Sequence, residues 1–483
     1  MVSLPVGLKR KTVAVLITAV GGMALSSSAW ALPSFSRQTG WSCAVCHTSY
    51  PQLTPMGRMF KLLGYTTTNL QQQQKLQFKF GRRVGLLLSR VSQFSIFVQA
   101  SATNVGGGQA AFGPNTSGSS INNNVQFPQQ VSLFYAGEIT PHIGDFLHLT
   151  YSGGGGPAGS GSSFAFDDSS IVWAHPWKMG SNNLLITGAD VNNTPTATDL
   201  WNTVPDWRAP FFYSNYSSSN YVPATFIGNA AGAAFPMAGI GTYAADIFGP
   251  DRANWIYAEA DVYTNANGTG ASPVGGYASA AGGPQGRLSG VAPYVRLAYQ
   301  HDWGDWNWEV GTFAMWSTIY SNSLAATSPI DQFDDYDLDS QLQWLDTNDN
   351  NNFTVRGAWI HENQKFSPGA LSSGLASGSL NTLNLNATYW YHDHYGVEGG
   401  YRNVWGTANP ALYVNTNIYS PDGSPDTSSE WIEASYLPWW NTRFSLRYTM
   451  YNQFRGVSGA SSSASGYAAS SYNTLELLAW IAY

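Results

Sequence analysis

The feature that most constrains the fold of this 483-residue chain is a repeated two-residue alternation of apolar and polar side chains. From about residue 91 to the C-terminus, segments of about ten residues alternate in this way, and clusters of Gly, Ser, Asn and Pro separate them. No segment after residue 31 reaches about 18 consecutive apolar residues, so the pattern excludes membrane-spanning helices. Alternating segments of this length are typical of the strands of outer-membrane β-barrels.

Three predicted hairpins show which face of each strand would meet lipid. Around the turn at residues 304–305, one face is aromatic and aliphatic, whereas the other carries Arg296, Asp302 and Glu309. The turns at residues 392–394 and 438–441 separate strands with the same arrangement. Charges suit a wet lumen and apolar side chains suit lipid. The predicted lipid-facing residues are Val295, Leu297, Tyr299, Trp303, Trp306, Trp308, Val310, Ala314, Leu383, Leu385, Ala387, Tyr389, Ile432, Ala434, Tyr436, Phe444, Leu446 and Tyr448.

The number of alternating segments predicts about 16 strands, joined by about seven short turns and about eight long loops. The last segment ends in an aromatic residue, Tyr483, with apolar residues at every second position before it, as is common in barrels assembled in the outer membrane. An even strand number places both ends of the barrel in the periplasm and the long loops, such as 103–124 and 406–428, outside. The predicted fold is all-β, an outer-membrane β-barrel over residues 91–483.

The first 31 residues have the composition of a secretory signal peptide. Three cations at positions 9–11 precede an apolar run over 12–25, and Ala29-Trp30-Ala31 has the small-x-small cleavage pattern. The run is too short to span a bilayer as a helix, so we expect cleavage after Ala31. The mature chain then carries 19 Lys and Arg against 29 Asp and Glu, a net charge of −10, which makes a nucleic-acid partner implausible.

A five-residue motif carries the chemistry. Cys43-Ala44-Val45-Cys46-His47 reads C-x-x-C-H, the attachment sequence of a c-type haem, in which the thiols add to the vinyl groups and the imidazole binds the iron. A thioredoxin-like redox pair would need a βαβ context, and a zinc site would need a second ligand pair, although the chain has only these 2 cysteines. We therefore predict one covalently bound haem c, held by Cys43, Cys46 and His47.

A short helix is predicted to follow the motif. Thr54 is a suitable N-cap, Pro55 fits the first helical position, and Gly64 fits the exit, which predicts a helix of about nine residues. Its apolar stripe, which we expect to cover the haem face, consists of Met56, Met59, Phe60 and Leu63. The thioether of Met56 or Met59 is a candidate sixth ligand, which would raise the haem potential. The alternative is that both methionines only pack on the porphyrin, and a lumenal histidine or water completes the iron.

The segment 32–90, between signal peptide and barrel, has a haem-bearing part of only about 45 residues, too small for an independent core. A 16-stranded barrel leaves an open channel unless something fills it. We therefore predict that this mono-haem cytochrome segment lies in or against the lumen. The basic residues that mark its junction with the barrel, with pairing to haem propionates as the alternative, are Lys79, Arg82, Arg83 and Arg90.

Five aspartates precede or begin a strand that should descend from the outer rim: Asp331, Asp334, Asp335, Asp337 and Asp339. Alternation directs Asp335, Asp337 and Asp339 toward the lumen, where carboxylates would attract a divalent cation such as Fe(II). A solvated rim or a calcium-stabilised loop is the alternative.

A second polar group, His392-Asp393-His394, offers metal-ligand or docking chemistry, but it falls on a predicted periplasmic turn. An ordinary polar surface turn is the plainer interpretation of this group.

The run C-A-V-C-H-T-S-Y-P-Q-L-T-P-M-G-R-M-F-K-L-L-G at 43–64, followed by a barrel, resembles the fused monohaem cytochrome-porins that serve as outer-membrane iron oxidases, the iron:rusticyanin reductase-like family. The stretch N-N-T-P-T-A-T-D-L-W-N-T at 192–203, the hairpin 293–316, and L-P-W-W-N followed by 448–454 are similar too. The resemblance implies an oxidoreductase that oxidises extracellular Fe(II) and passes the electron through the haem to a periplasmic cupredoxin of the rusticyanin type or to a c-type cytochrome. It implies roles for Cys43, Cys46 and His47, but fixes neither a sixth ligand nor an iron-binding residue.

Two other functions are compatible with a haem motif followed by a β-barrel. One is a haem-plugged porin that acts as a gate or redox sensor, and the other is a conduit that exports electrons to an extracellular mineral. The direction of electron flow depends on a reduction potential that the sequence does not give.

Overall fold

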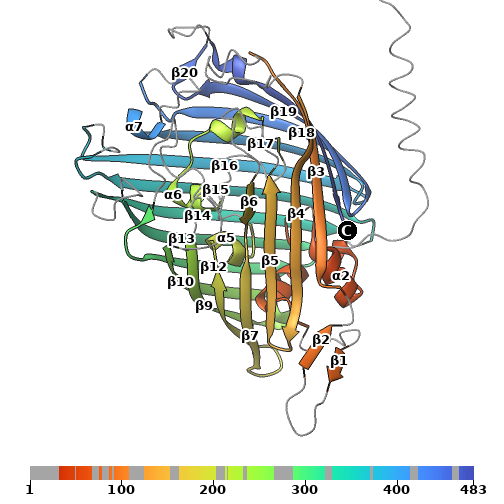
Figure 1. Ribbon diagram of the computed structural model, residues 1–483. Helices are drawn as coiled ribbons and strands as arrows, with labels where there is room; N and C mark the ends of the chain where they lie inside the picture. The colour runs from red at the N-terminus through yellow and green to blue at the C-terminus, as the bar shows by residue number, and fades with distance from the viewer. Residues whose placement is uncertain are drawn as a thin grey trace, which may run out of the picture.

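The computed structural model is a closed barrel of antiparallel strands that wraps around a small helical segment (Figure 1). The structure describes residues 32–48, 50–67, 75–78, 86–89, 92–107, 124–152, 163–202, 213–214, 216–231, 237–265, 287–320, 329–346, 348–369, 372, 374–413, 422–459 and 467–483. The predicted signal peptide, 1–31, and the junction residues Lys79, Arg82, Arg83 and Arg90 lie outside these ranges.

Sixteen strands form the wall, and three of them are interrupted. The pairs β6 and β7, β11 and β12, and β20 and β21 each continue one strand along a shared neighbour. The bounds are β3 (Phe94–Val105), β4 (Asn124–Thr140), β5 (Ile143–Ser152), β6 (Ser163–Phe166), β7 (Ser170–Lys178), β8 (Leu184–Asn192), β9 (Met237–Phe248), β10 (Asn254–Asn265), β11 (Arg287–Leu288), β12 (Ala292–Trp303), β13 (Trp306–Tyr320), β14 (Ile330–Asp346), β15 (Asn351–Lys365), β16 (Ser377–Tyr391), β17 (Tyr395–Gly406), β18 (Thr427–Trp439), β19 (Thr442–Phe454), β20 (Val457–Ser458) and β21 (Thr474–Ala482).

Pairing of the last strand with the first closes the barrel. Thr474 lies opposite Val105 and Ala482 lies opposite Phe97, in antiparallel register. Short turns join the strands at one end, for example between β12 and β13 and between β16 and β17, and longer connections join them at the other. The predicted fold class is confirmed, and the wall begins at Phe94, close to the predicted residue 91.

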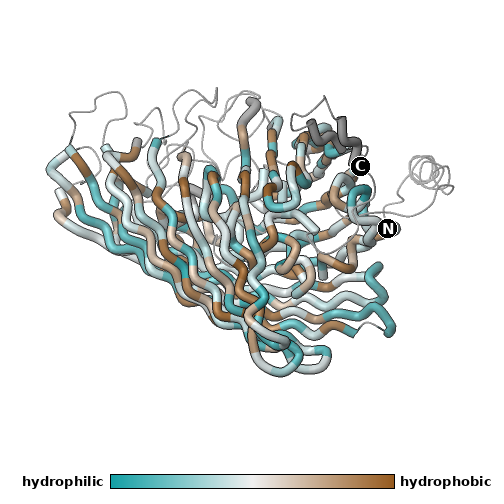
Figure 2. Tube along the Cα trace, turned by 90° about the horizontal axis from the view of Figure 1, so that it is seen from below, coloured by the Kyte–Doolittle hydropathy of each residue, from teal (hydrophilic) through white to brown (hydrophobic). Residues whose placement is uncertain are grey.

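The strands alternate between the lumen and the outer surface, as Figure 2 shows by the change of hydropathy along each strand. On the hairpin of β12 and β13, Leu297 is 57% exposed, whereas Arg296 is 1% exposed. The predicted orientation of the three hairpins and of the last strand is confirmed by their burial patterns. An apolar outer face combined with a polar lumen is the arrangement of outer-membrane barrels.

Three helices precede the wall: α2 (Pro33–Thr39), α3 (Cys43–Cys46) and α4 (Pro55–Leu62). The predicted helix after the motif is confirmed as α4, since the Thr54 side chain accepts a hydrogen bond from the Gly57 N–H, and Gly64 has a φ of +63° at the exit. None of the helices in the described ranges is long and apolar enough to cross a bilayer. A two-stranded sheet, β1 (Lys75–Phe78) with β2 (Leu86–Ser89), follows them.

The helical segment lies in the lumen near the short turns. The buried Arg58 of α4 donates hydrogen bonds to Asn307 of β13 and to Gln343 of β14 (3.0 Å to Oε1). On another part of the wall, the Gln38 side chain of α2 donates to the backbone oxygen of Ala136 (2.9 Å). These contacts fix the segment against wall strands that are far apart in sequence.

The connection between β8 and β9 also folds into the lumen. Its described parts include α5 (Pro195–Thr198), η2 (Ser218–Tyr221) and α6 (Phe226–Ala231), and Figure 1 shows α5 and α6 inside the barrel. Phe226 and Ile227 are fully buried in a cluster with wall residues such as Phe333. The sequence analysis did not predict this second filling of the lumen. The remaining helices described are η3 (Pro250–Arg252), α7 (Pro410–Tyr413) and η4 (Ala469–Tyr472).

Candidate functional site

The C-x-x-C-H motif forms α3 and the residue that follows it. Cys43 is 3% exposed, Cys46 is half-buried, and the two thiols are free rather than joined in a disulfide. Burial raises the pKa of Cys43 well above its ordinary value and raises that of Cys46 to about 11. Both groups are therefore neutral thiols at physiological pH, without the low pKa of a catalytic redox pair.

His47 is oriented as a metal ligand would be. Its Nδ1 lies 3.3 Å from the backbone oxygen of Gln52, which fixes Nδ1 as the protonated nitrogen and leaves Nε2 available to a metal. Burial lowers the pKa of His47 to about 4, so the ring is neutral above that pH. A neutral imidazole with one nitrogen bonded to a backbone carbonyl is the usual form of an axial histidine.

Helix α4 holds the motif in place through close backbone contact. The Thr54 N–H donates to the Cys46 oxygen (2.9 Å), and the Thr54 hydroxyl donates to the Val45 oxygen (2.6 Å). A Cβ at Gly57 would lie 2.2 Å from the Cys46 oxygen, so only glycine permits this approach. The sequence analysis missed Gly57, although a glycine one turn into a capped helix signals such an approach.

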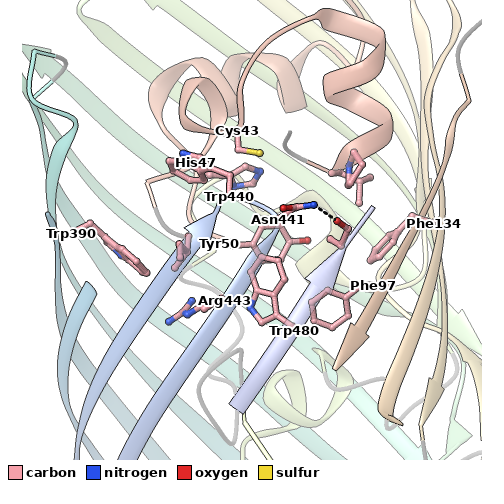
Figure 3. A pocket seen from close by; sticks show the side chains of 14 residues that line it. Cys43, His47, Tyr50, Phe97, Phe134, Trp390, Trp440, Asn441, Arg443 and Trp480 are labelled. Atoms are coloured by element: carbon pink, nitrogen blue, oxygen red, sulfur yellow. Dashed lines mark hydrogen bonds between the residues drawn. The ribbon is translucent and has the colours of Figure 1, made fainter. Parts of the chain in front are cut away.

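A pocket opens between the motif and the wall (Figure 3). About 540 Å³ of empty space lies between its lining side chains, part of it open to solvent. Cys43 and His47 line one side, and Figure 3 shows aromatic side chains of the wall on the others. The remaining lining residues are Leu32, Pro33, Tyr50, Phe97, Phe134, Trp390, Leu437, Trp440, Asn441, Arg443, Trp480 and Ala482.

The lining of this pocket suits a haem in its chemistry. Its walls are mainly aromatic, with Tyr50 and Trp480 at 5.7 Å and Phe97 and Trp480 at 5.5 Å between ring centroids. A porphyrin needs such flat apolar surfaces, and the one cation in the described lining, Arg443, is paired with Glu433 (2.7 Å). Among the described residues, the motif belongs to no group of three or more metal-ligating side chains, which disfavours the zinc alternative.

Neither candidate sixth ligand lines this pocket. Met56 is 46% exposed, and Met59 packs with Phe60 and Leu62 in a cluster that includes Trp201 and Tyr243. Phe60, Met59 and Leu63 pack instead in a cluster with wall residues such as Ile186 and Tyr257, apart from this pocket. A methionine as sixth ligand gains no support from this placement.

The predicted acidic strand is β14, and its lumenal orientation is as expected: Asp335, Asp337 and Asp339 are at most 6% exposed. The Arg296 guanidinium binds Asp339 with two hydrogen bonds of 2.8 and 2.9 Å and lies 4.0 Å from Asp337. Asp335 accepts a hydrogen bond from the Ile227 N–H (2.6 Å) at the start of α6. Much of the charge predicted to steer Fe(II) is thus compensated by the protein itself.

Both histidines of the turn 392–394 are hydrogen-bonded to the backbone of adjacent turns. His392 Nδ1 lies 2.6 Å from the Asp349 oxygen, and His394 Nδ1 lies 2.6 Å from the Leu437 oxygen. Burial raises the pKa of Asp393 to about 6. The group joins adjacent turns, which agrees with the plainer structural interpretation.

A second carboxylate group was missed by the sequence analysis. Asp190 of β8 and Glu259 and Asp261 of β10 are buried in the lumen, with their ligand atoms within 4.8 Å of one another. The signal in the sequence was weak, because single acidic residues in separate strands form no motif. Alternation alone would have placed Glu259 and Asp261 on one face.

Comparison with known proteins finds only distant structural likeness. No family model matches the chain, and no curated protein matches it. Similar solved structures include the outer-membrane channel DcaP of Acinetobacter baumannii, 11% identical, with a TM-score of 0.44 and coverage of 81% of this chain and 96% of that one. OprB of Pseudomonas putida is also 11% identical, with a TM-score of 0.44 and coverage of 81% and 93%. OmpT of Vibrio cholerae is 10% identical, with a TM-score of 0.42 and coverage of 81% and 97%.

The chain is a 16-stranded β-barrel of the outer-membrane type. The likeness to these solved barrels concerns architecture and says nothing of a haem or of iron.

Proposed function

We propose that this chain is an outer-membrane c-type cytochrome that oxidises extracellular Fe(II) and reduces a periplasmic carrier. One observation carries the proposal: Cys43 and His47 of a C-x-x-C-H motif line an aromatic pocket inside the barrel. Each Fe²⁺ gives up one electron and becomes Fe³⁺, and the carrier, a cupredoxin of the rusticyanin type or a c-type cytochrome, gains that electron. The signal peptide 1–31 would be removed on export.

The residues of the pocket have distinct roles in holding the cofactor. Cys43 and Cys46 would form the two thioether bonds, His47 Nε2 would bind the iron, and the Gln52 oxygen keeps the ring in the required tautomer. Gly57 allows the backbone of α4 to lie in close contact with that of Cys46. When bound, the haem would supply a one-electron redox centre.

The pocket lies at the end of the barrel where a carrier would reach it. Trp440 and Asn441 of the short β18–β19 turn and Ala482 near the C-terminus line it. Short turns of bacterial barrels face the periplasm, and long loops face the exterior. The donor and the acceptor therefore meet the protein on opposite sides, and the poorly soluble ferric product stays outside.

The filled lumen supports electron transfer over solute transport. The helical segment, with Arg58 bonded across to β13 and β14, and the β8–β9 connection both occupy it. The resemblance of residues 43–64 to the iron:rusticyanin reductase-like family points the same way.

The direct test is anaerobic mixing of purified, oxidised full-length protein with Fe(II), followed at the α-band of reduced haem by stopped flow. We expect rapid reduction in the wild type and loss of covalent haem in a Cys43→Ser/Cys46→Ser variant. His47→Ala should lose the axial ligand and shift the haem spectrum, whereas His392→Ala, in the short turn between β16 and β17, should leave it unchanged.

Two results would overturn the proposal. One is a chain that carries no covalent haem when it is exported together with the haem-attachment machinery. The other is a haem that Fe(II) does not reduce, with a potential far below that of the iron couple. Solute conductance by the intact protein in bilayers would then favour the gated-porin function.

A further inference from the structure

We propose that Asp190, Glu259 and Asp261 form a binding site for one divalent cation in the lumen. The site is separate from the acidic run of β14 and from the haem pocket. The proposal deepens the proposed function, and it rests on that function only for the identity of the natural ion as Fe²⁺.

The register of three neighbouring strands brings the carboxylates together. Asp190 of β8 and Asp261 of β10 both lie opposite Gly241 of the strand between them, β9. Glu259, two residues from Asp261, projects from the same lumenal face. One ligand atom from each side chain lies within 4.8 Å of the others, a spacing that a single cation can bridge.

Gly241 makes the space for this arrangement. A Cβ at this position would lie 1.3 Å from Oδ1 of Asp261, so the carboxylate occupies the volume that any side chain would fill. No side chain at position 241 therefore separates the two aspartates. The carboxylates can occupy these positions only because residue 241 is a glycine.

Some carboxylate oxygens of the site accept hydrogen bonds from neighbouring side chains, and others do not. The Tyr263 hydroxyl donates to Oδ2 of Asp261 (3.1 Å), and the Asn192 amide donates to Oδ1 of Asp190 (2.6 Å). Among the described residues, the other oxygen of each aspartate and both oxygens of Glu259, which is 4% exposed, lack a hydrogen-bond partner of ordinary geometry, although the Thr198 and Tyr257 side chains lie close enough to interact with Glu259. Buried carboxylate oxygens without donors are costly unless a cation satisfies them.

The residues around the three carboxylates do not neutralise their negative charge. Lys61 of α4 lies close enough for its charge to interact with Glu259, but its Nζ donates to the Asp199 backbone oxygen (2.6 Å), and it forms no ion pair among the described residues. The Thr198 hydroxyl donates to the Pro195 oxygen (2.9 Å). Thr198 also lies close to Glu259, so the described part of the segment noted for its resemblance, 192–202, lies beside this site.

The chemistry of the ligands defines the class of ion. A site made only of carboxylate oxygens suits Mn²⁺, Fe²⁺, Mg²⁺ or Ca²⁺, and lacks the nitrogen or sulfur that favours zinc or copper. Tyr243, opposite Glu259 in the register, donates from its hydroxyl to the Leu62 oxygen of α4 (2.6 Å). The site is therefore in contact, through one side chain, with the segment that carries the motif.

Manganese provides the test, because the free aqueous ion has an EPR signal that is lost on binding. Purified full-length protein in detergent is titrated with Mn²⁺, and we expect one bound ion per chain. Glu259→Gln should weaken binding at least tenfold. Asp246→Asn removes the same charge from the outer face of β9 and should bind as the wild type does.

Asp190→Asn provides a second variant if Glu259→Gln does not fold, as judged by the gel mobility of the unheated barrel. Absence of Mn²⁺ binding by the wild type, or equal binding by the wild type and the folded variants, would overturn the site. Haem reduction by Fe(II) is measured separately. Mn²⁺ binding without haem reduction would leave the site standing and refute Fe(II) oxidation, and the converse result would refute the site alone.

Discussion

The lumen holds two groups of buried carboxylates that differ in how their charge is compensated. In the first, Asp337 and Asp339 of β14 and Glu309 of β13 surround Arg296, which lies 2.8 Å from Asp339 and 3.3 Å from Glu309. In the second, Asp190, Glu259 and Asp261 form no ion pair with a cation in the part of the chain that the structure describes.

The difference shows that lumenal orientation alone does not identify a cation site. Both groups are buried by the same alternation, but the first already contains a guanidinium fixed by two strands. An additional metal ion there would have to compete with Arg296. The second group is arranged around a glycine and lacks only a cation, which makes it the better place for a divalent ion.

Arg296→Met should have the largest effect, because it removes the cation of the first group and leaves its carboxylates uncompensated. We expect the free energy of unfolding to fall by about 3–5 kcal/mol. Urea unfolding followed by tryptophan fluorescence measures it, with Arg252→Met in the exposed η3 turn as the control. A loss below about 1 kcal/mol would show that the first group does not depend on its arginine.

Addition of Mn²⁺ should stabilise the barrel through the second group. At 100 times the dissociation constant, one site adds about 2.7 kcal/mol to the free energy of unfolding, and chelation should reverse this. The same unfolding assay with and without Mn²⁺ checks the prediction. If Glu259→Gln were stabilised as much as the wild type, the ion would be bound elsewhere.

Gly241→Ala should weaken Mn²⁺ binding at least tenfold, about 1.4 kcal/mol, because its Cβ would displace the Asp261 carboxylate. Gly399→Ala is the matched control, since its nearest contact would be at 3.9 Å. EPR titration of both variants compares them. Unchanged affinity in Gly241→Ala would mean that Asp261 does not bind the ion.

Lys61→Met should have the smallest effect, a few-fold gain in Mn²⁺ affinity from the loss of a nearby positive charge. Burial lowers the pKa of Lys61 from its ordinary 10.5, so the folded protein disfavours the charged form. The stability of the wild type should therefore rise as the pH increases toward 10.5, and the variant should lose this dependence. Unfolding midpoints across that range test it, and parallel curves for the two proteins would contradict it.

Local patterns were sufficient to predict much of the molecule. Alternation depends only on the two-residue period of a strand, so the outward direction of Leu297 and the inward direction of Arg296 could be predicted without a partner strand. Helix α4 was predictable because Thr54, Pro55 and Gly64 act within one or two turns. The motif likewise needs only five consecutive residues.

Contacts between distant segments could not be predicted in this way. The pocket walls come from β3, β4, β16, β19 and β21, and they meet because the barrel closes and the helical segment enters it. The filling of the lumen by the β8–β9 connection, which places Ile227 against Asp335, has no periodic signal.

The barrel, the direction of its side chains, the capped helix and the C-x-x-C-H motif were predictable because each follows from residues close together in the chain. Which carboxylates form ion pairs, and which side chains surround the motif, depends on contacts between distant segments. Those properties depend on strand register, on Gly241 lying between Asp190 and Asp261, and on packing within the closed lumen.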